Sequence, residues 1–365
     1  MSASAHFHEL KVSRIRSEAG HAVVIALHVP EALRSSFEFT PGQFVTVKAL
    51  IQGADVRRSY SICSTPRHLH TTGDIEIGVR VIQGGVFSAW ASTDLREGDV
   101  LFVMAPDGRF VSKQPDALHR VGFAAGSGIT PVLSIMQHSL ETQAQSHFSL
   151  IYGNQNMNSV MFNETLQDLK DRYPERVTLV HVLSRQAQEV DLLQGRIDKD
   201  KVQRLIDTLL PVKNMDEVFV CGPEGMIEAT CEALMTAGVP QEQIHSERFA
   251  SSSAPSMQRN INKSSQDKHA TSGAVELTVV MDGKQHALRM SADEHILDVA
   301  LAAGLDLPYS CRGGVCCTCR AKVLEGTVAM DKNFTLEKWE TDQGFVLSCQ
   351  SKPTSTRVTL SYDER

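Results

Sequence analysis

The chain of 365 residues has a net charge of -7, with 42% hydrophobic and 22% charged residues. This length predicts two or three domains, and the acidic balance argues against a nucleic-acid-binding protein, which normally presents a basic face. No apolar run approaches the ~20 residues of a membrane helix, and the polar start of the chain is unlike a signal peptide. We therefore expect a cytoplasmic protein with reduced thiols, whose cysteines are metal ligands or buried groups rather than disulfides.

Residues 1–113 are expected to form a small antiparallel β-barrel domain. Short runs of alternating apolar residues recur between turn residues, namely HAVVIALHV (21–29), GQFVTVKAL (42–50), DIEIGVRVI (74–82) and DVLFVMA (99–105). Runs of period two at this spacing are typical of antiparallel barrels.

Two motifs within this domain have the chemistry of a flavin site. In RRSYSI (57–62), Arg58 is a candidate partner for a flavin phosphate, Tyr60 for the isoalloxazine ring, and the Ser61 hydroxyl for the reactive edge of that ring. In GGVFSAW (84–90), residues 85–88 are predicted to begin a helix whose N–H groups receive the pyrophosphate. Taken alone, the first motif fits an edge strand with a solvent-exposed Arg equally well.

Residues 114–249 alternate strand-like and helix-like runs. RVGFAAG precedes TPVLSIMQHSL, HFSLIYGN precedes FNETLQDLKDRY, VTLVHVLSR precedes DKVQRLIDTLL, and EVFVCGP precedes GMIEATCEALMTAG. This alternation predicts βαβ units and therefore an α/β domain with a parallel sheet.

The first strand-to-helix turn of this domain, AAGSGITPVLSI (124–135), indicates a phosphate site. Gly126 and Gly128 permit close approach of the backbone to a phosphate, as in dinucleotide-binding folds. We predict that Thr130 caps the following helix and that Pro131 occupies its first position.

Two further motifs end strands of the same sheet. Ser184 and Arg185 end the third strand, where an acid favours NAD and an Arg beside a hydroxyl suits a 2′-phosphate. A solvent-facing loop Arg is the alternative. CGPEGM (221–226) closes the fourth strand and places the Cys221 thiol and a tight turn where a nicotinamide fits.

Residues 250–273, rich in Ser, Asn, Gln and Lys, are predicted to be an interdomain linker. Residues 274–365 are then expected to form a compact α+β domain. VELTVVM and KQHALRM flank Asp282 and Gly283, which is a strong hairpin signal. Ser291 and Glu294 have the spacing of a capping box, and the helix predicted after them ends at Gly304.

The loop SCRGGVCCTCR (310–320) holds four of the 8 cysteines. Cys311, Cys316 and Cys319 fit a C-x4-C-x2-C spacing and Cys349 follows in VLSCQ, which is the plant-type arrangement for a [2Fe–2S] cluster. Zinc sites prefer two separated C-x2-C pairs, and the sequence has only one. We therefore predict a [2Fe–2S] cluster on these four cysteines, with Cys317 as a bystander.

Residues 1–249 resemble the ferredoxin–NADP reductase superfamily, and residues 275–365 resemble a plant-type ferredoxin of β-grasp fold. More narrowly, the chain resembles the reductase subunits of phenylacetyl-CoA epoxidase. The segments that carry this resemblance are RRSYSIC, AAGSGITP, LIYGN, DLLQGRID, CGPEGM, IHSERF and CRGGVCCTCRAKVLEGTVAM. The resemblance implies FAD, NADPH and a [2Fe–2S] cluster as cofactors.

The resemblance also implies roles for individual residues. FAD would be bound by Arg58, Ser59, Tyr60, Ser61, Val79, Arg80, Gly85, Val86, Phe87 and Ser88. The nicotinamide nucleotide would be bound by Gly126, Ser127, Gly128, Thr130, Pro131, Ser184, Arg185, Cys221, Gly222 and Pro223. Catalytic positions would fall to Ser61, Cys221, Glu247 and Phe249, the last two close to the flavin, and iron would be held by Cys311, Cys316, Cys319 and Cys349.

The resulting hypothesis is a reductase that splits electron pairs. NADPH gives a hydride to the flavin, and electrons then leave singly through the cluster to a partner, which by resemblance is a di-iron monooxygenase acting on phenylacetyl-CoA. An NADH-dependent reductase of another oxygenase, such as a ring-hydroxylating dioxygenase or a steroid hydroxylase, is the main alternative. A non-enzymatic redox sensor is a second one, but it leaves the flavin and nucleotide sites without a role.

Overall fold

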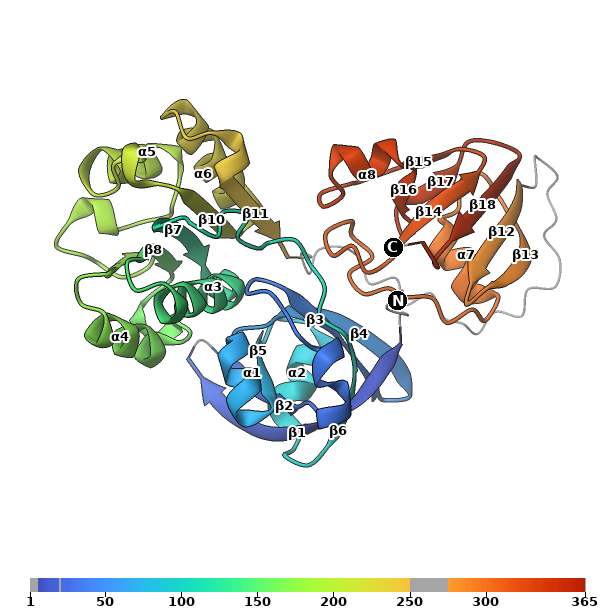
Figure 1. The fold of residues 1–365 in the computed structure, drawn as a ribbon, viewed down its shortest axis with the longest axis horizontal. Coiled ribbons are helices and arrows are strands. Elements are labelled where there is room, and N and C mark those ends of the chain that lie inside the picture. The colour runs from blue at the N-terminus through green and yellow to red at the C-terminus, as the bar shows by residue number, and fades with distance from the viewer. Residues whose placement is uncertain (1–5, 20, 250–274, 365) are drawn as a thin grey trace. The chain divides into compact units, whose positions relative to one another are not determined.

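The computed structural model describes residues 6–19, 21–249 and 275–364 (Figure 1). Phe7–Phe249 form one compact unit, and the C-terminal part of the chain belongs to a second unit. The predicted linker, 250–273, lies outside the described residues. The predicted boundary between residues 113 and 114 stays a prediction, because the two sheets on either side of it belong to the same unit.

The first sheet of the larger unit is an antiparallel barrel with the strand order β4-β3-β6-β1-β2-β5. A bridge between Ile62 and Ile77 connects the chain after β4 to β5 and closes it. Its elements are β1 (Phe7–Glu18), β2 (Ala22–His28), β3 (Phe44–Ile51), β4 (Ala54–Ser61), α1 (Pro66–Thr72), β5 (Asp74–Arg80), α2 (Val86–Thr93) and β6 (Val100–Met104).

Strand β2 is buried on both faces, which explains its nearly continuous apolar sequence. Val23 and Ile25 contribute to the core inside the barrel. Ala22 and Val24 point outward and join a second core, which includes residues from the helices and strands of the neighbouring sheet. The barrel is therefore fused to the second sheet through one wall.

The second sheet is parallel, with the strand order β11-β10-β7-β8-β9. Its elements are β7 (His119–Ala125), α3 (Ile129–Thr142), β8 (His147–Asn154), α4 (Asn163–Arg172), β9 (Val177–Leu183), α5 (Lys199–Thr208), β10 (Glu217–Gly222), α6 (Glu224–Thr236) and β11 (Ile244–Arg248). Helices α3 and α4 cover the face towards the barrel, and α5 and α6 cover the other face (Figure 1). The predicted α/β domain with a parallel sheet is confirmed.

The start of α3 differs from the prediction. Gly126–Gly128 already form a turn of 3-10 helix, so α3 follows with Gly128 as its N-cap. Thr130 and Pro131 are therefore the second and third helical residues, and the predicted cap and first position are wrong. The Thr130 hydroxyl donates to the Ser127 carbonyl at 3.0 Å, so it serves the turn rather than a free N–H group.

The C-terminal unit contains a five-stranded mixed sheet with the order β13-β12-β18-β14-β16 and a small β15–β17 pair. Its elements are β12 (Val275–Met281), β13 (Lys284–Met290), α7 (Ile296–Ala302), β14 (Arg320–Glu325), β15 (Val328–Met330), α8 (Lys338–Asp342), β16 (Phe345–Leu347), β17 (Ser351–Pro353) and β18 (Arg357–Ser361). The α+β class predicted for this domain is confirmed. No helix in the described part of the chain is long and apolar enough to span a membrane.

Two local predictions in this unit have different outcomes. Asp282 and Gly283 both have positive φ, as a two-residue hairpin turn of type I′ requires, so the predicted hairpin is confirmed. The capping box does not begin the helix: the Glu294 carboxylate accepts the Ser291 N–H at 2.8 Å in a separate turn, and α7 begins only after His295. The end of the helix agrees with the sequence, because Gly304 follows it with a φ of 86°.

Candidate functional site

Strand β4 carries the residues predicted to face a flavin. Tyr60 is half-buried, and its ring lies 5.4 Å from the ring of Phe87 on α2. Ser59 is fixed from the neighbouring strand, because its hydroxyl lies 3.0 Å from the Thr46 hydroxyl. Arg58 is exposed and is therefore available to a phosphate group, whereas its neighbour Arg57 is buried.

The start of α2 offers backbone rather than side-chain groups. Gly85 is the N-cap, and the Ser88 hydroxyl accepts the N–H of Ile82 at 3.3 Å, which ties the preceding loop to the first helical turn. Phe87 and Ser88 are buried, while Val86 is exposed. The free N–H groups of this turn are thus the feature that fits a pyrophosphate.

Residues from the two sheets meet beside these flavin positions. The Ser61 hydroxyl, at the end of β4, donates to the Glu247 carboxylate of β11 at 3.3 Å. Burial raises the pKa of Glu247 to about 8, although the Ser61 hydrogen bond opposes this. Cys221, at the end of β10, is fully buried, and burial together with the nearby Glu247 charge raises the pKa of its thiol. Three of the four predicted catalytic residues therefore converge on one place.

The fourth predicted catalytic residue, Phe249, directly follows β11 and is 40% exposed. Its side chain is therefore available to a ring system rather than committed to the core. Val79, by contrast, is fully buried within the barrel and offers a cofactor only its backbone.

The glycine-rich turn and the CGPEGM turn lie against each other at the carboxyl edge of the parallel sheet. A Cβ atom on Gly128 would collide with the carbonyl oxygen of Cys221, and one on Gly222 would come within 3.1 Å of the Ala125 Cβ. Pro223 is the exposed N-cap of α6. Ligands of open α/β sheets bind at this edge, so the geometry fits a dinucleotide.

The predicted 2′-phosphate position is built from two loops. The N–H of Ser184 donates to the Asn154 carbonyl at 2.9 Å and the N–H of Arg185 to the Gln155 carbonyl at 2.8 Å, which extends the parallel pairing of β8 and β9. The side chain of Arg185 is exposed.

The structure adds one residue that the sequence analysis missed. Leu183 bridges to Gln194 in parallel, and the N–H of Gly195 donates to the Leu183 carbonyl at 2.9 Å. Arg185 lies two residues after Leu183 on one segment, and Arg196 lies two residues after Gln194 on the other. Neither guanidinium forms an ion pair with any residue that the structure describes. The QGRID motif was visible in the sequence, but its pairing beside β9 was not.

The four predicted cluster cysteines come together as two pairs. The Cys311 thiol lies beside that of Cys316, and the Cys319 thiol lies beside that of Cys349. The Cys316 thiol, with the N–H groups of the loop, lowers the pKa of Cys311 to about 6. In the described residues, no three His, Cys, Asp or Glu side chains converge on a point that would hold a single metal ion. Two thiol pairs instead fit two iron atoms, each taking two thiolates.

Cys317 faces elsewhere. It has a positive φ of 55°, and its sulfur lies 2.9 Å from the Thr335 hydroxyl within the core of the domain. This geometry supports the predicted bystander role.

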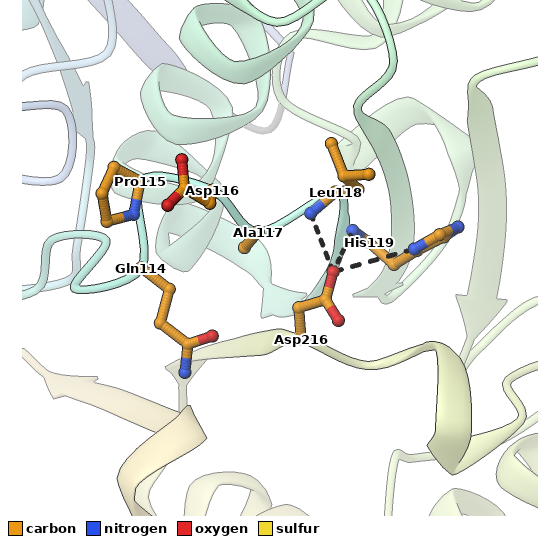
Figure 2. Close-up of a pocket in the computed structure, with 7 residues that line it drawn as sticks. All are labelled: Gln114, Pro115, Asp116, Ala117, Leu118, His119 and Asp216. Carbon is orange, nitrogen blue, oxygen red and sulfur yellow. Dashed lines mark hydrogen bonds and ion pairs between the residues drawn. The ribbon is translucent and has the colours of Figure 1, made fainter.

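A separate hollow of about 570 Å³ lies at the opposite, amino-terminal end of β7 and β10 (Figure 2). In it the Asp216 carboxylate accepts the N–H groups of Leu118 and His119, both at 2.8 Å. None of the predicted site residues lines this hollow. It is therefore distinct from the cofactor sites.

Three protein families match the sequence. They are the oxidoreductase FAD-binding domain over residues 9–111, the oxidoreductase NAD-binding domain over residues 123–232 and the 2Fe-2S iron-sulfur cluster binding domain over residues 279–354. A component of 1,2-phenylacetyl-CoA epoxidase from Escherichia coli (strain K12) is 42% identical to the chain over 363 residues, which cover 98% of both proteins.

The chain belongs to the family of oxygenase reductase components that includes this epoxidase component. A second member, the ferredoxin reductase component of 3-ketosteroid-9-alpha-monooxygenase from Mycobacterium tuberculosis (strain CDC 1551 / Oshkosh), is 33% identical and covers 98% of this chain and 97% of its own. The solved structure of phthalate dioxygenase reductase shares the fold, with 21% identity, a TM-score of 0.60 and coverage of 97% of this chain and 98% of that chain.

The reductase is therefore an electron-transfer oxidoreductase with FAD-binding, NAD-binding and [2Fe–2S] domains, and the two relatives named above are components of oxygenase systems. The predicted family, fold class and enzyme class are confirmed.

Replacing Cys349 by Ser should abolish the cluster, because one of the two thiol pairs then has a single member. Replacing Cys317 by Ala should leave it intact. The cluster content of both variants is measured by iron and sulfide analysis, by visible absorption and by the electron paramagnetic resonance of the dithionite-reduced protein. Loss of iron from the Cys317→Ala variant at wild-type stability would contradict the assignment of ligands.

The pKa of Glu247 predicts a pH dependence of stability. Because its value of about 8 in the folded protein lies above that of an unfolded carboxyl, the stability it contributes is present at low pH and is lost as the pH rises through about 8. Glu247→Gln, which stays neutral, should therefore gain in melting temperature relative to the wild type between pH 6 and 9. Parallel curves for the two proteins over that range would show that the carboxyl is ionised throughout.

Proposed function

We propose that this protein oxidises NADPH and supplies single electrons to a di-iron monooxygenase that epoxidises phenylacetyl-CoA. The observation that carries the proposal is the 42% identity to the 1,2-phenylacetyl-CoA epoxidase component over nearly the full length of both chains. A cytoplasmic location belongs to the same proposal, and the 8 cysteines, all free thiols in the structure, agree with it.

Bound FAD would accept a hydride from the nucleotide, and the [2Fe–2S] cluster would carry electrons away one at a time. The chain's own residues orient and shield these groups. Tyr60 offers a ring face, and the N–H groups at the start of α2 offer donors for the pyrophosphate. Glu247, whose pKa burial raises to about 8, and the Ser61 hydroxyl would provide a hydrogen-bonding pair at the reacting edge.

The preference for NADPH rests on Arg185 and Arg196. Two exposed guanidinium groups on adjacent backbone segments, beside the Ser184 hydroxyl, suit a dianionic 2′-phosphate through charge-assisted hydrogen bonds. An enzyme for NADH would gain nothing from this cluster, because its nucleotide carries a ribose hydroxyl at that position.

A substitution tests this preference directly. Arg185→Ala and Arg196→Ala should each lower kcat/KM for NADPH by about tenfold, because a hydrogen bond to a charged group contributes roughly 1.5–3 kcal/mol. The value for NADH should hardly change. Arg204→Ala, an exposed arginine on α5 in the same domain, is the matched control. Equal losses with NADPH and NADH would remove the argument for a 2′-phosphate site.

The partner is tested by reconstitution. The purified reductase, mixed with di-iron epoxidase subunits, should consume NADPH and convert phenylacetyl-CoA in matching amounts. Reduction of an artificial one-electron acceptor is the control for an intact reductase. If that acceptor is reduced but the epoxidase is not supported, the partner assignment is wrong while the electron-transfer chemistry stands.

A second candidate partner is a steroid oxygenase, favoured by the 33% identity to the 3-ketosteroid-9-alpha-monooxygenase component. The same reconstitution with that oxygenase distinguishes the two. A non-enzymatic redox sensor, in contrast, would not reduce the artificial acceptor rapidly with either nucleotide.

A further inference from the structure

One fully buried polar side chain, Tyr152 on β8, belongs to none of the predicted sites yet contacts the nucleotide turn directly. Its hydroxyl donates to the carbonyl oxygen of Gly126 at 2.9 Å and lies 3.4 Å from the carbonyl oxygen of Met161. The same Gly126 carbonyl also accepts the N–H of Ile129, the first residue of α3. Both lone pairs of this oxygen are therefore used.

Gly126 also needs to be a glycine. Its φ of 53° lies in the left-handed region, and a Cβ atom there would collide with the guanidinium of Arg80 on β5. The motion of the turn that concerns a ligand is rotation of the peptide group between Gly126 and Ser127, because it would exchange the Gly126 carbonyl for the Ser127 N–H. The Tyr152 hydroxyl opposes that rotation, because it anchors the carbonyl on the protein side.

We propose that Tyr152 is a positioning residue for nucleotide binding: its hydroxyl fixes the Gly126–Ser127 peptide so that the N–H of Ser127, in the turn before α3, points towards the dinucleotide. The carbonyl of a peptide group points opposite to its N–H, so anchoring one directs the other. A flipped peptide would present a carbonyl oxygen to the phosphates and repel them. This inference rests on the proposed nucleotide site.

The hydroxyl keeps its proton under all working conditions. Burial raises the pKa of Tyr152 well above its ordinary value, against the smaller effects of the nearby Asn154 amide and the Arg80 charge. It therefore remains a donor to Gly126. The ring itself fills the core that joins α3, α4 and the barrel, so the role of the ring and the role of the hydroxyl are separable by one substitution.

Tyr152→Phe keeps the ring and removes the hydroxyl. With the FAD-loaded protein, we expect the dissociation constant of the preferred nucleotide to rise roughly 3- to 10-fold, as the loss of one hydrogen bond implies. KM should rise in proportion while kcat stays within about twofold, since the reacting groups are untouched. Calorimetry with the oxidised nucleotide gives the binding constant without turnover.

Tyr173→Phe is the matched control, because Tyr173 packs against the same core and its hydroxyl has no hydrogen bond among the described residues. Its binding constants should equal those of the wild type. A Tyr152→Phe variant that melts earlier but binds nucleotide as tightly as the control would reduce Tyr152 to a structural role. So would a fall in kcat at constant KM.

The experiments distinguish a failure of the Tyr152 proposal from a failure of the proposed NADPH-dependent function. The turn would contact parts that NADPH and NADH share, so the loss of affinity is expected with whichever nucleotide the enzyme prefers. If NADH proves to be the substrate, the proposed 2′-phosphate site falls, and the Tyr152 effect on NAD⁺ binding still decides the inference.

Discussion

The hydrogen bond from Ser61 to Glu247 joins residues 186 positions apart and exists only because the barrel packs against one face of the parallel sheet. That packing depends on the outward residues Ala22 and Val24 of β2, which enter the core around α3. The Ser134 hydroxyl of α3 also donates to the Ser64 carbonyl of the barrel, at 2.6 Å and fully buried. Without this junction, a flavin on the barrel and a nucleotide on the sheet would have no common reacting point.

The cluster site, in contrast, is formed mainly by residues that are close together in the sequence. Three of its four predicted cysteines lie within nine residues, and the fourth lies two residues after the end of β16. The loop alone determines most of the geometry, so the site forms within one small domain. Electron transfer needs both kinds of site, but only the flavin–nucleotide site depends on how two sheets are assembled.

The difference between a site formed by one loop and a site formed by two sheets explains which features could be predicted from the sequence. The cysteine spacing, the alternating strands and the Asp282-Gly283 hairpin are local signals, and each agrees with the structure. The starts of α3 and α7 were misplaced because a preceding turn absorbs the residues that look like caps. Arg196 and Tyr152 were missed because their importance arises from pairing and burial that no short window of sequence contains.

The glycines of the nucleotide turn illustrate how binding and packing are combined. A motif of this kind is read as a phosphate-binding signal, yet Gly128 is required here by the carbonyl of Cys221 even without a ligand. Gly78 on β5 is likewise close to the Thr130 methyl group, with a Cβ there only 2.8 Å away. The missing side chains thus let β5, the turn after β7 and the end of β10 approach one another. In the proposed enzyme, the glycines at this junction would therefore serve the placement of Cys221 as well as the affinity for a nucleotide.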